Sequence, residues 1–205
     1  MNLFRSFVTV GFWTFLSRIL GLARDLAIAA TLGAGPVAEA FWVAFSLPNM
    51  FRRFFAEGAL NTAFLPLFSK KLESGEGAEV FARDVFSLLA GLLIVFTVAA
   101  MLAMPALVLA MAYGFQSDAR FEIATLMGRI TFPYILFISL AALLSGILNA
   151  HRRFVAAAAA PILLNGFFLS GLALATHAGW DFGLTLAWTV PVAGVAQLAF
   201  VWVAA

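Results

Sequence analysis

Long uncharged hydrophobic runs alternate with short polar stretches along this chain of 205 residues. The longest uncharged runs cover residues 85–117, 130–150, 154–176 and 182–205. Each is as long as the roughly 20 residues with which an α-helix crosses the hydrocarbon core of a bilayer. Two further apolar stretches, nearer the N-terminus, are interrupted by charges. The pattern predicts an all-α, polytopic membrane helix bundle with six transmembrane helices, at about residues 7–31, 37–68, 85–113, 124–150, 154–176 and 182–205.

The composition supports this prediction and excludes several kinds of chemistry. Hydrophobic residues make up 64% of the chain and charged residues only 11%, whereas a soluble domain carries about 25% charged residues. The formal net charge is +2, without a basic arm, so nothing indicates a nucleic-acid partner. The absence of cysteine excludes disulfides, thiolate metal sites and a cysteine nucleophile. His151 and His177 lie far apart at the ends of predicted spans, so we expect no metal site.

Lysine and arginine residues outside the predicted spans are distributed unevenly between the two sides of the membrane. One side has Arg5, Lys70, Lys71, Arg83, Arg152 and Arg153, and the other has Arg120. Because cytoplasmic loops carry an excess of Lys and Arg, the N-terminus and the end of the sixth span are predicted to be cytoplasmic. The sequence stops within an apolar run, without a polar tail. We therefore expect a truncated chain, or a half-protein that lacks its partner half.

The first predicted span carries three charged residues, Arg18, Arg24 and Asp25. Ionisable residues inside a membrane are costly and usually face a bundle interior or a water-filled cavity, so they indicate function. At about 100° per residue, Arg18 and Asp25 lie roughly 20° apart around the helix, and Arg24 lies roughly 80 to 120° from each. All three side chains can therefore face the same interior.

The second predicted span, residues 37–68, is too long for a straight helix across the membrane. At about 1.5 Å per residue it would measure roughly 48 Å, against a hydrocarbon core of about 30 Å. Pro48 lacks a backbone N–H and is the predicted kink. A helix that restarts after this kink would direct free N–H groups toward Arg52, as in anion-binding broken helices of transporters. Arg53 and Glu57 form an i,i+4 pair on the same span.

The predicted depths of these charges indicate an anionic ligand. If the first two spans are antiparallel neighbours, Arg24 comes level with Arg52 and Arg18 with Glu57. Arg18 and Glu57 can neutralise each other, but two arginines at one depth repel unless an anion joins them. Guanidinium groups bind phosphate oxygens through paired hydrogen bonds, so we predict that Arg24 and Arg52 bind a diphosphate. Internal salt bridges that fix helix register remain the alternative.

Other polar residues leave their roles open. Glu39 lies near the outer end of the second span and is either a gate or a solvated loop end. Arg129 either adds positive charge to a cavity or extends to the membrane interface. Asn149 and Asn165 could form hydrogen bonds between helices.

Several segments resemble signatures of the bacterial MurJ/MviN family of lipid II flippases. The sequence SRILGLARD at residues 17–25 is similar to the family's first-helix signature. The sequence LPNMFRRFFAEGA at residues 47–59 is similar to its second-helix signature. ITFPYIL at residues 130–136 and GILNA at residues 146–150 are similar to its fourth helix. The similarity extends over essentially the whole chain.

This resemblance implies a fold and roles for individual residues. The family belongs to the multidrug/oligosaccharidyl-lipid/polysaccharide exporter superfamily and has two six-helix lobes and two extra helices; residues 1–205 resemble the first lobe. By resemblance, Arg24 and Arg52 bind the lipid II diphosphate. The positions implied to set cavity charge or gating are Arg18, Asp25, Glu39, Arg53 and Glu57. At the position of Glu39 the family often has aspartate, which carries the same charge on a shorter side chain.

The resemblance also implies an activity. It is the translocation of lipid II, the undecaprenyl-diphosphate-linked peptidoglycan precursor, from the cytoplasmic to the outer leaflet of the bacterial cytoplasmic (inner) membrane by alternating access. The implied partners are lipid II, membrane lipids and the missing C-terminal lobe, with no cofactor and no catalytic residue. One alternative is a flippase of the same superfamily for another lipid-linked glycan. Another is a membrane polyprenyl-diphosphate phosphatase, which would need a nucleophile near the arginines; His151 is predicted to lie far from their depth.

Overall fold

The computed structural model of the protein describes residues 3–53, 62–75 and 77–205, and every regular element within these residues is a helix. The elements are α1 (Leu3–Leu32), α2 (Pro36–Arg52), α3 (Leu65–Ser74), α4 (Ala78–Leu102), α5 (Met104–Met111), the 3-10 helix η2 (Tyr113–Phe115), α6 (Ala119–Thr131), α7 (Tyr134–Ala150), α8 (Phe154–Ala178) and α9 (Phe182–Ala204). The all-α prediction is confirmed.

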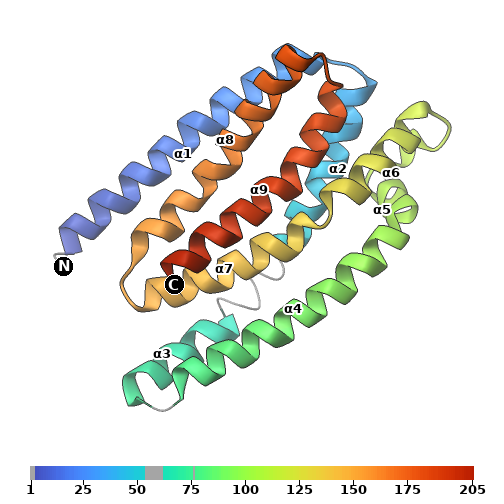
Figure 1. The fold of residues 1–205 in the computed structure, drawn as a ribbon. Coiled ribbons are helices and arrows are strands. Elements are labelled where there is room, and N and C mark those ends of the chain that lie inside the picture. The colour runs from blue at the N-terminus through green and yellow to red at the C-terminus, as the bar shows by residue number, and fades with distance from the viewer. Residues whose placement is uncertain (1–2, 54–61, 76) are drawn as a thin grey trace.

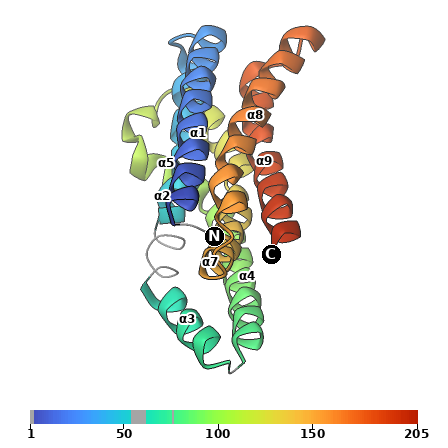
Figure 2. The same ribbon diagram turned by 90° about the vertical axis from the view of Figure 1, so that its left-hand side faces the viewer.

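The long helices lie side by side as a bundle (Figure 1). α1 packs along α8, α8 along α9, and α9 along α7, while α4 packs against the other side of α7. α2 packs mainly against α6. When the molecule is turned, α3 is seen at one end of the bundle, beyond the end of α2 (Figure 2).

One hydrophobic cluster joins six helices, α1, α2, α6, α7, α8 and α9, at the centre of the bundle. Ile28 of α1, Phe41 of α2, Tyr134 of α7, Phe168 of α8 and Leu186 of α9 are buried together in it. The Phe168 ring contacts Phe41 edge to face, with the ring centroids 6.2 Å apart. Burial of such large side chains contributes about 1.5–3 kcal/mol each. This packing fixes how α1, α2 and α8 face one another.

The predicted first, fifth and sixth spans agree closely with α1, α8 and α9. Among the residues that the structure describes, four helical segments are long and apolar enough to cross a membrane, namely Ala78–Leu102, Ala119–Ala150, Phe154–Ala178 and Phe182–Ala204. α1 carries three charged residues in its second half, and α2 has only 17 residues. The count of six spans therefore stays a prediction.

The second predicted span contains two described α-helices. α2 ends at Arg52 and α3 begins at Leu65, and residues 54–61 between them lie outside the described residues. α2 continues through Pro48, so the predicted restart between Pro48 and Arg52 is wrong. Pro48 cannot donate a hydrogen bond to the Ala44 carbonyl. Thr131 of α6 supplies one instead, since its Oγ1 donates to the Ala44 oxygen at 3.1 Å.

The polar segment 69–84, between the second and third predicted spans, is largely helical. α3 extends to Ser74 and α4 starts at Ala78, so the connection is short. Gly75 and Gly77 have φ angles of 71° and 62°, a left-handed conformation that glycine adopts without steric cost. α3 buries Phe68, whereas its polar residues Lys70, Glu73 and Ser74 are exposed. Its amphipathic pattern explains why a polar sequence forms a helix there.

The third and fourth predicted spans are each broken once. α4 ends at Leu102 and α5 begins at Met104, followed by Pro105; α6 ends at Thr131 and α7 begins after Pro133. A proline at the start of a helix loses no intrahelical bond, because the first N–H groups have no partner there. Each of these two predicted spans therefore contains two helices, and Ala119–Ala150 as a whole remains long and apolar enough to cross a membrane.

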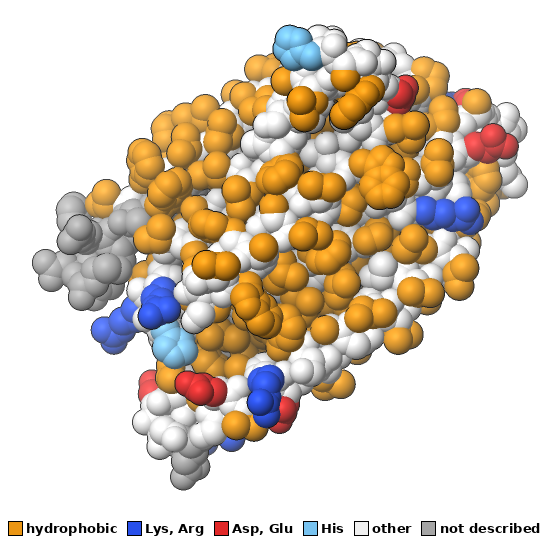
Figure 3. Space-filling view, in the orientation of Figure 1, with side chains coloured by type: hydrophobic (Ala, Val, Ile, Leu, Met, Phe, Trp, Pro, Cys, Tyr) orange, Lys and Arg blue, Asp and Glu red, His pale blue; other side chains and the backbone are white. Residues whose placement is uncertain are grey.

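The surface has the polarity of a membrane protein. On the face shown in Figure 3, hydrophobic side chains cover the middle, and most charged and histidine side chains gather at the two ends. Large apolar residues are openly exposed on this bundle, for example Leu88, Val95 and Leu102 on α4 and Trp188 on α9. A soluble monomer rarely exposes so large a continuous apolar area. Lipid is the solvent that such a surface requires.

Glycine at position 194 permits the close approach of α9 to α7. An added Cβ there would lie 2.7 Å from Cδ2 of Tyr134 and 3.2 Å from Cβ of Phe137. We expect Gly194→Ala to lower stability by on the order of 1 kcal/mol, because a rigid ring must shift. Gly91→Ala on α4 is the control, since nothing lies within 4 Å of its Cβ. Thermal unfolding in detergent should separate the variants; equal melting temperatures would contradict the tight α7–α9 contact.

Candidate functional site

Arg24 lies on α1 where α1 packs against α8, and three side chains hold its guanidinium group. Its Nε and Nη2 donate to Oδ1 of Asp25 at 2.9 and 2.8 Å. Its Nη1 donates to Oδ1 of Asn165 at 3.0 Å. The Phe168 ring lies 5.5 Å from its Cζ, a favourable cation–π distance. The Arg24 side chain is 16% exposed, so it is largely shielded and still reachable.

These contacts leave a defined part of the Arg24 guanidinium group available. Arginine has five N–H donors and no acceptor. The three hydrogen bonds to Asp25 and Asn165 use one donor on each of its three nitrogens. One N–H therefore remains on each terminal nitrogen. Two such donors are what a guanidinium group needs to hold a phosphate through paired hydrogen bonds.

Arg52 lies at the end of α2 and lines a pocket of about 270 Å³ between α3, α7, α8 and α9. Ser145 and Asn149 of α7 and Gln197 of α9 supply polar groups to the pocket wall. Most of the remaining lining is alanine, glycine or other apolar residues. Arg52 thus combines a positive charge with a small, partly polar cavity.

A buried polar network joins α7, α8 and α9. The Tyr134 hydroxyl donates to Oε1 of Gln197 at 3.2 Å, and Nε2 of Gln197 donates to the Ala160 carbonyl at 2.9 Å. Tyr134 is buried in the same hydrophobic cluster as Phe168, whose ring lies beside Arg24, and Gln197 lines the pocket of Arg52. The network therefore connects the surroundings of the two arginines.

The remaining predicted charges are arranged differently. Arg18 is exposed on α1, Arg53 is exposed just after α2, and Glu57 lies outside the described residues. The premise that the first two spans pack as antiparallel neighbours is wrong, because α1 packs along α8 and α2 along α6. The depth estimate built on that premise is therefore replaced by the contacts above. Arg129 donates from Nε to the Met101 carbonyl at 3.2 Å, at the end of α4.

Glu39 belongs to a second charged cluster. Its carboxylate pairs with Arg120, which also binds Oδ2 of Asp118 at 2.7 Å and stacks on Phe115 at 4.6 Å. Hydrogen bonds from the backbone N–H and side chain of Arg120 hold the pKa of Asp118 below its usual value. Glu39 is therefore not a free loop end. It joins the start of α2 to the first turn of α6.

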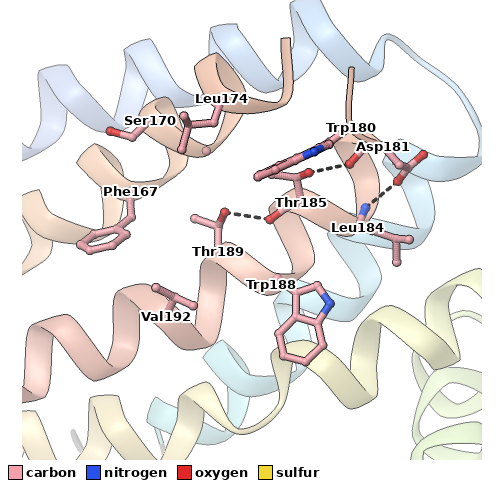
Figure 4. A pocket seen from close by; sticks show the side chains of 11 residues that line it. Phe167, Ser170, Leu174, Trp180, Asp181, Leu184, Thr185, Trp188, Thr189 and Val192 are labelled. Atoms are coloured by element: carbon pink, nitrogen blue, oxygen red, sulfur yellow. Dashed lines mark hydrogen bonds between the residues drawn. The ribbon is translucent and has the colours of Figure 1, made fainter. Parts of the chain in front are cut away.

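A larger groove, of about 700 Å³, opens between α8 and α9 and is mainly apolar (Figure 4). Its threonine hydroxyl groups are already used, because Thr185 donates to the Asp181 carbonyl and Thr189 to the Thr185 carbonyl, both at 2.7 Å. Asp181 caps α9 by accepting from the Leu184 N–H at 2.7 Å. This groove offers no cation to a diphosphate. Within the described residues, no three His, Asp or Glu side chains gather to hold a metal ion.

Sequence reasoning predicted an interhelical hydrogen bond for Asn165, which is confirmed, but missed its partner Arg24. It assigned no role to Thr131, Tyr134 or Gln197. Gln197 had a visible signal, since it is the one amide in the uncharged run 182–205. A lone amide in such a run favours a bond between helices. The role of Thr131 could be found only by asking which group donates to the Ala44 carbonyl, because Pro48 has no N–H to do so.

Comparisons with known proteins agree with this arrangement. A family model described as "Lipid II flippase MurJ" matches residues 28–205. The "Probable lipid II flippase MurJ" of Rhizobium tropici is 46% identical over 210 residues, covering 99% of this chain and 39% of that protein. The "Lipid II flippase MurJ" of Burkholderia cenocepacia is 43% identical over 201 residues, covering 96% and 39%. A solved structure, "Lipid II flippase MurJ, inward closed conformation", matches with a TM-score of 0.74 and 27% identity, covering 94% of this chain and 40% of that one.

The helix bundle, its apolar surface and its charged site define a polytopic α-helical membrane protein of the transporter type. The chain belongs to the MurJ lipid II flippase family. It spans about two fifths of the length of the relatives it matches.

Proposed function

We propose that this chain forms the N-terminal lobe of a lipid II flippase and that Arg24 and Arg52 bind the lipid II diphosphate. The relatives are named for this activity, and they are about 2.5 times longer than this chain. The observation that carries the proposal is the state of Arg24: partly buried, held from three sides, and with one N–H left on each terminal nitrogen. Such a group is pre-organised for a phosphate.

The other charges have supporting roles in this proposal. Arg18, Arg53 and Glu57 adjust the charge of the cavity, and Asp25 both orients Arg24 and limits its excess charge. Glu39, paired with Arg120, joins the elements that close the outer side. Flipping breaks no covalent bond, so the site needs no nucleophile. Alternating access then requires this lobe to move against a second lobe, which corresponds to the part of the longer relatives that this chain does not cover.

The proposal places the chain in the bacterial cytoplasmic membrane with a cytoplasmic N-terminus. α3 and the connection before α6 lie at opposite ends of the bundle (Figure 1). The chain has no cysteine, so single thiols can be introduced without background. We expect Glu73→Cys to react with an impermeant maleimide only after the inner face is exposed, and Ser117→Cys to react in intact spheroplasts. Labelling of both from the same side would contradict this topology.

Lipid II binding to the purified chain in nanodiscs tests the proposed function directly. We expect saturable binding of fluorescent lipid II that unlabelled lipid II displaces. Undecaprenyl monophosphate, which has the same tail, should compete at least about tenfold less well, because it offers fewer charged oxygens. Equal competition by another lipid-linked glycan diphosphate would support the broader flippase alternative. Release of inorganic phosphate during the incubation would support the phosphatase alternative instead.

A further inference from the structure

We propose that Asn165 is a positioning residue for the diphosphate site: it aims the free N–H groups of Arg24 at the cargo without adding a charge. The inference rests on the proposed function, because it assigns a role within the same site. Asn165 lies on α8, 141 residues from Arg24 in sequence, and is 5% exposed. A buried amide in a membrane helix carries a cost unless its polar atoms are used.

Both ends of the Asn165 amide are used, and by different groups. Its Oδ1 accepts from Nη1 of Arg24 at 3.0 Å, and its Nδ2 donates to the Ser17 carbonyl at 3.0 Å. Rotating the amide by 180° would place donor against donor and acceptor against acceptor. The bond to Ser17 therefore fixes which end of the amide faces Arg24. Gly21 lies against the same amide, where even an added Cβ would be only 3.8 Å from Nδ2.

The neutral charge of Asn165 matters as much as its geometry. Asp25 already contributes one negative charge to Arg24 through two hydrogen bonds. A carboxylate at position 165 would keep an acceptor for Nη1 of Arg24 but would give the arginine two negative neighbours. The local charge would then repel a diphosphate. An amide orients the guanidinium group and leaves its positive charge for the ligand.

Two substitutions separate orientation from general structural support. Asn165→Leu is close in volume and removes the acceptor. We expect lipid II affinity to fall about tenfold, because the guanidinium group is no longer held in its binding orientation and must be ordered when the ligand binds. Asn165→Asp is nearly isosteric and keeps the acceptor, yet we expect a larger loss, about 100-fold, that shrinks as salt is raised. Both substitutions also remove the donor to the Ser17 carbonyl, so a purely structural role predicts affinity losses that follow the losses of thermal stability and do not depend on salt.

The binding experiment uses the purified full chain in nanodiscs with fluorescent lipid II, together with thermal unfolding of every variant. Thr189→Val is the control, because its hydroxyl donates only within its own helix; its affinity should equal that of the unsubstituted chain. Arg24→Lys provides a double-mutant cycle. Once the guanidinium fork is gone, adding Asn165→Leu should lower affinity less than about twofold further, because nothing remains to be oriented.

The outcomes are distinguishable. If Arg24→Ala leaves lipid II affinity unchanged, the proposed diphosphate site itself is wrong. If Arg24→Ala weakens binding while Asn165→Leu and Asn165→Asp do not, the site stands and Asn165 has no positioning role. If Asn165→Leu weakens binding by the same factor in the unsubstituted chain and in the Arg24→Lys variant, its effect is general and the positioning role is refuted. Coupled losses with aspartate worse than leucine support the proposal.

Discussion

Replacing both Arg24 and Arg52 with alanine should lower the affinity of the chain for lipid II by at least about 100-fold. Each hydrogen bond between charged groups contributes about 1.5–3 kcal/mol, and both arginines would lose theirs. Arg24→Lys and Arg52→Lys keep the positive charge but lose the planar fork, so each should weaken binding by a smaller factor, about tenfold. Fluorescence anisotropy with labelled lipid II in nanodiscs measures the lipid II affinity of the unsubstituted chain and of all three variants.

Arg83→Ala is the matched control for these substitutions. Arg83 is exposed near the start of α4, and its replacement removes the same charge and side chain. It should leave affinity within about twofold, because exposed charges separated by more than a Debye length are largely screened. If the double variant binds as tightly as the unsubstituted chain, Arg24 and Arg52 serve internal salt bridges and fix helix register instead.

Replacing Gln197 should have the largest effect on stability. Gln197 is 1% exposed and joins α7 and α8 to α9 through Tyr134 and the Ala160 carbonyl. Gln197→Leu keeps the volume and removes both bonds, and we expect a loss of about 2 kcal/mol. Gln197→Ala also leaves a cavity, so its loss should be larger, about 3 kcal/mol. Unfolding in SDS–detergent mixtures, followed by tryptophan fluorescence, gives these values.

Gln116→Leu makes the same change on the exposed connection after η2. It should alter stability by less than about 0.5 kcal/mol, the usual range for surface substitutions. Equal stability of Gln197→Leu and Gln116→Leu would show that the buried network contributes nothing beyond packing. Gln197→Ala should be less stable than Gln197→Leu, because only the alanine variant removes side-chain volume. This difference tests the contribution of packing separately from that of the hydrogen bonds.

Most helix positions could be predicted because uncharged runs have a simple physical meaning in a membrane. α8 and α9 begin at the first residue of the runs that start at 154 and 182. The connection between them is short and polar, where the chain leaves the apolar environment. Helix breaks were harder to predict, because hydropathy does not change across them. Proline does not decide them alone, since α2 passes through Pro48 while α6 and α7 are separated at Pro133.

That difference depends on neighbours that no local pattern reveals. Thr131 supplies the donor that the Ala44 carbonyl needs, and Thr131 is 87 residues away from it. The site shows the same limit. Arg24 was predicted as an interior charge, but its partner Asn165 follows from the packing of α1 on α8, which the order of spans does not specify. Charge indicates candidate interior residues, of which Arg24 is shielded and Arg18 is exposed, and packing decides which residues meet.

The pairing of Arg24 with Asp25 has a consequence for how the chain enters the membrane during synthesis. The two residues are consecutive, so their ion pair can form as soon as α1 exists, long before α8 with Asn165 and Phe168 has been made. An isolated arginine at the bilayer centre costs at least about 2.5 kcal/mol on insertion scales. A neighbouring carboxylate offsets part of this cost. If α1 crosses the bilayer as predicted, it carries the charge of Arg24 with a counter-ion from its own sequence, and the contacts with Asn165 and Phe168 form later.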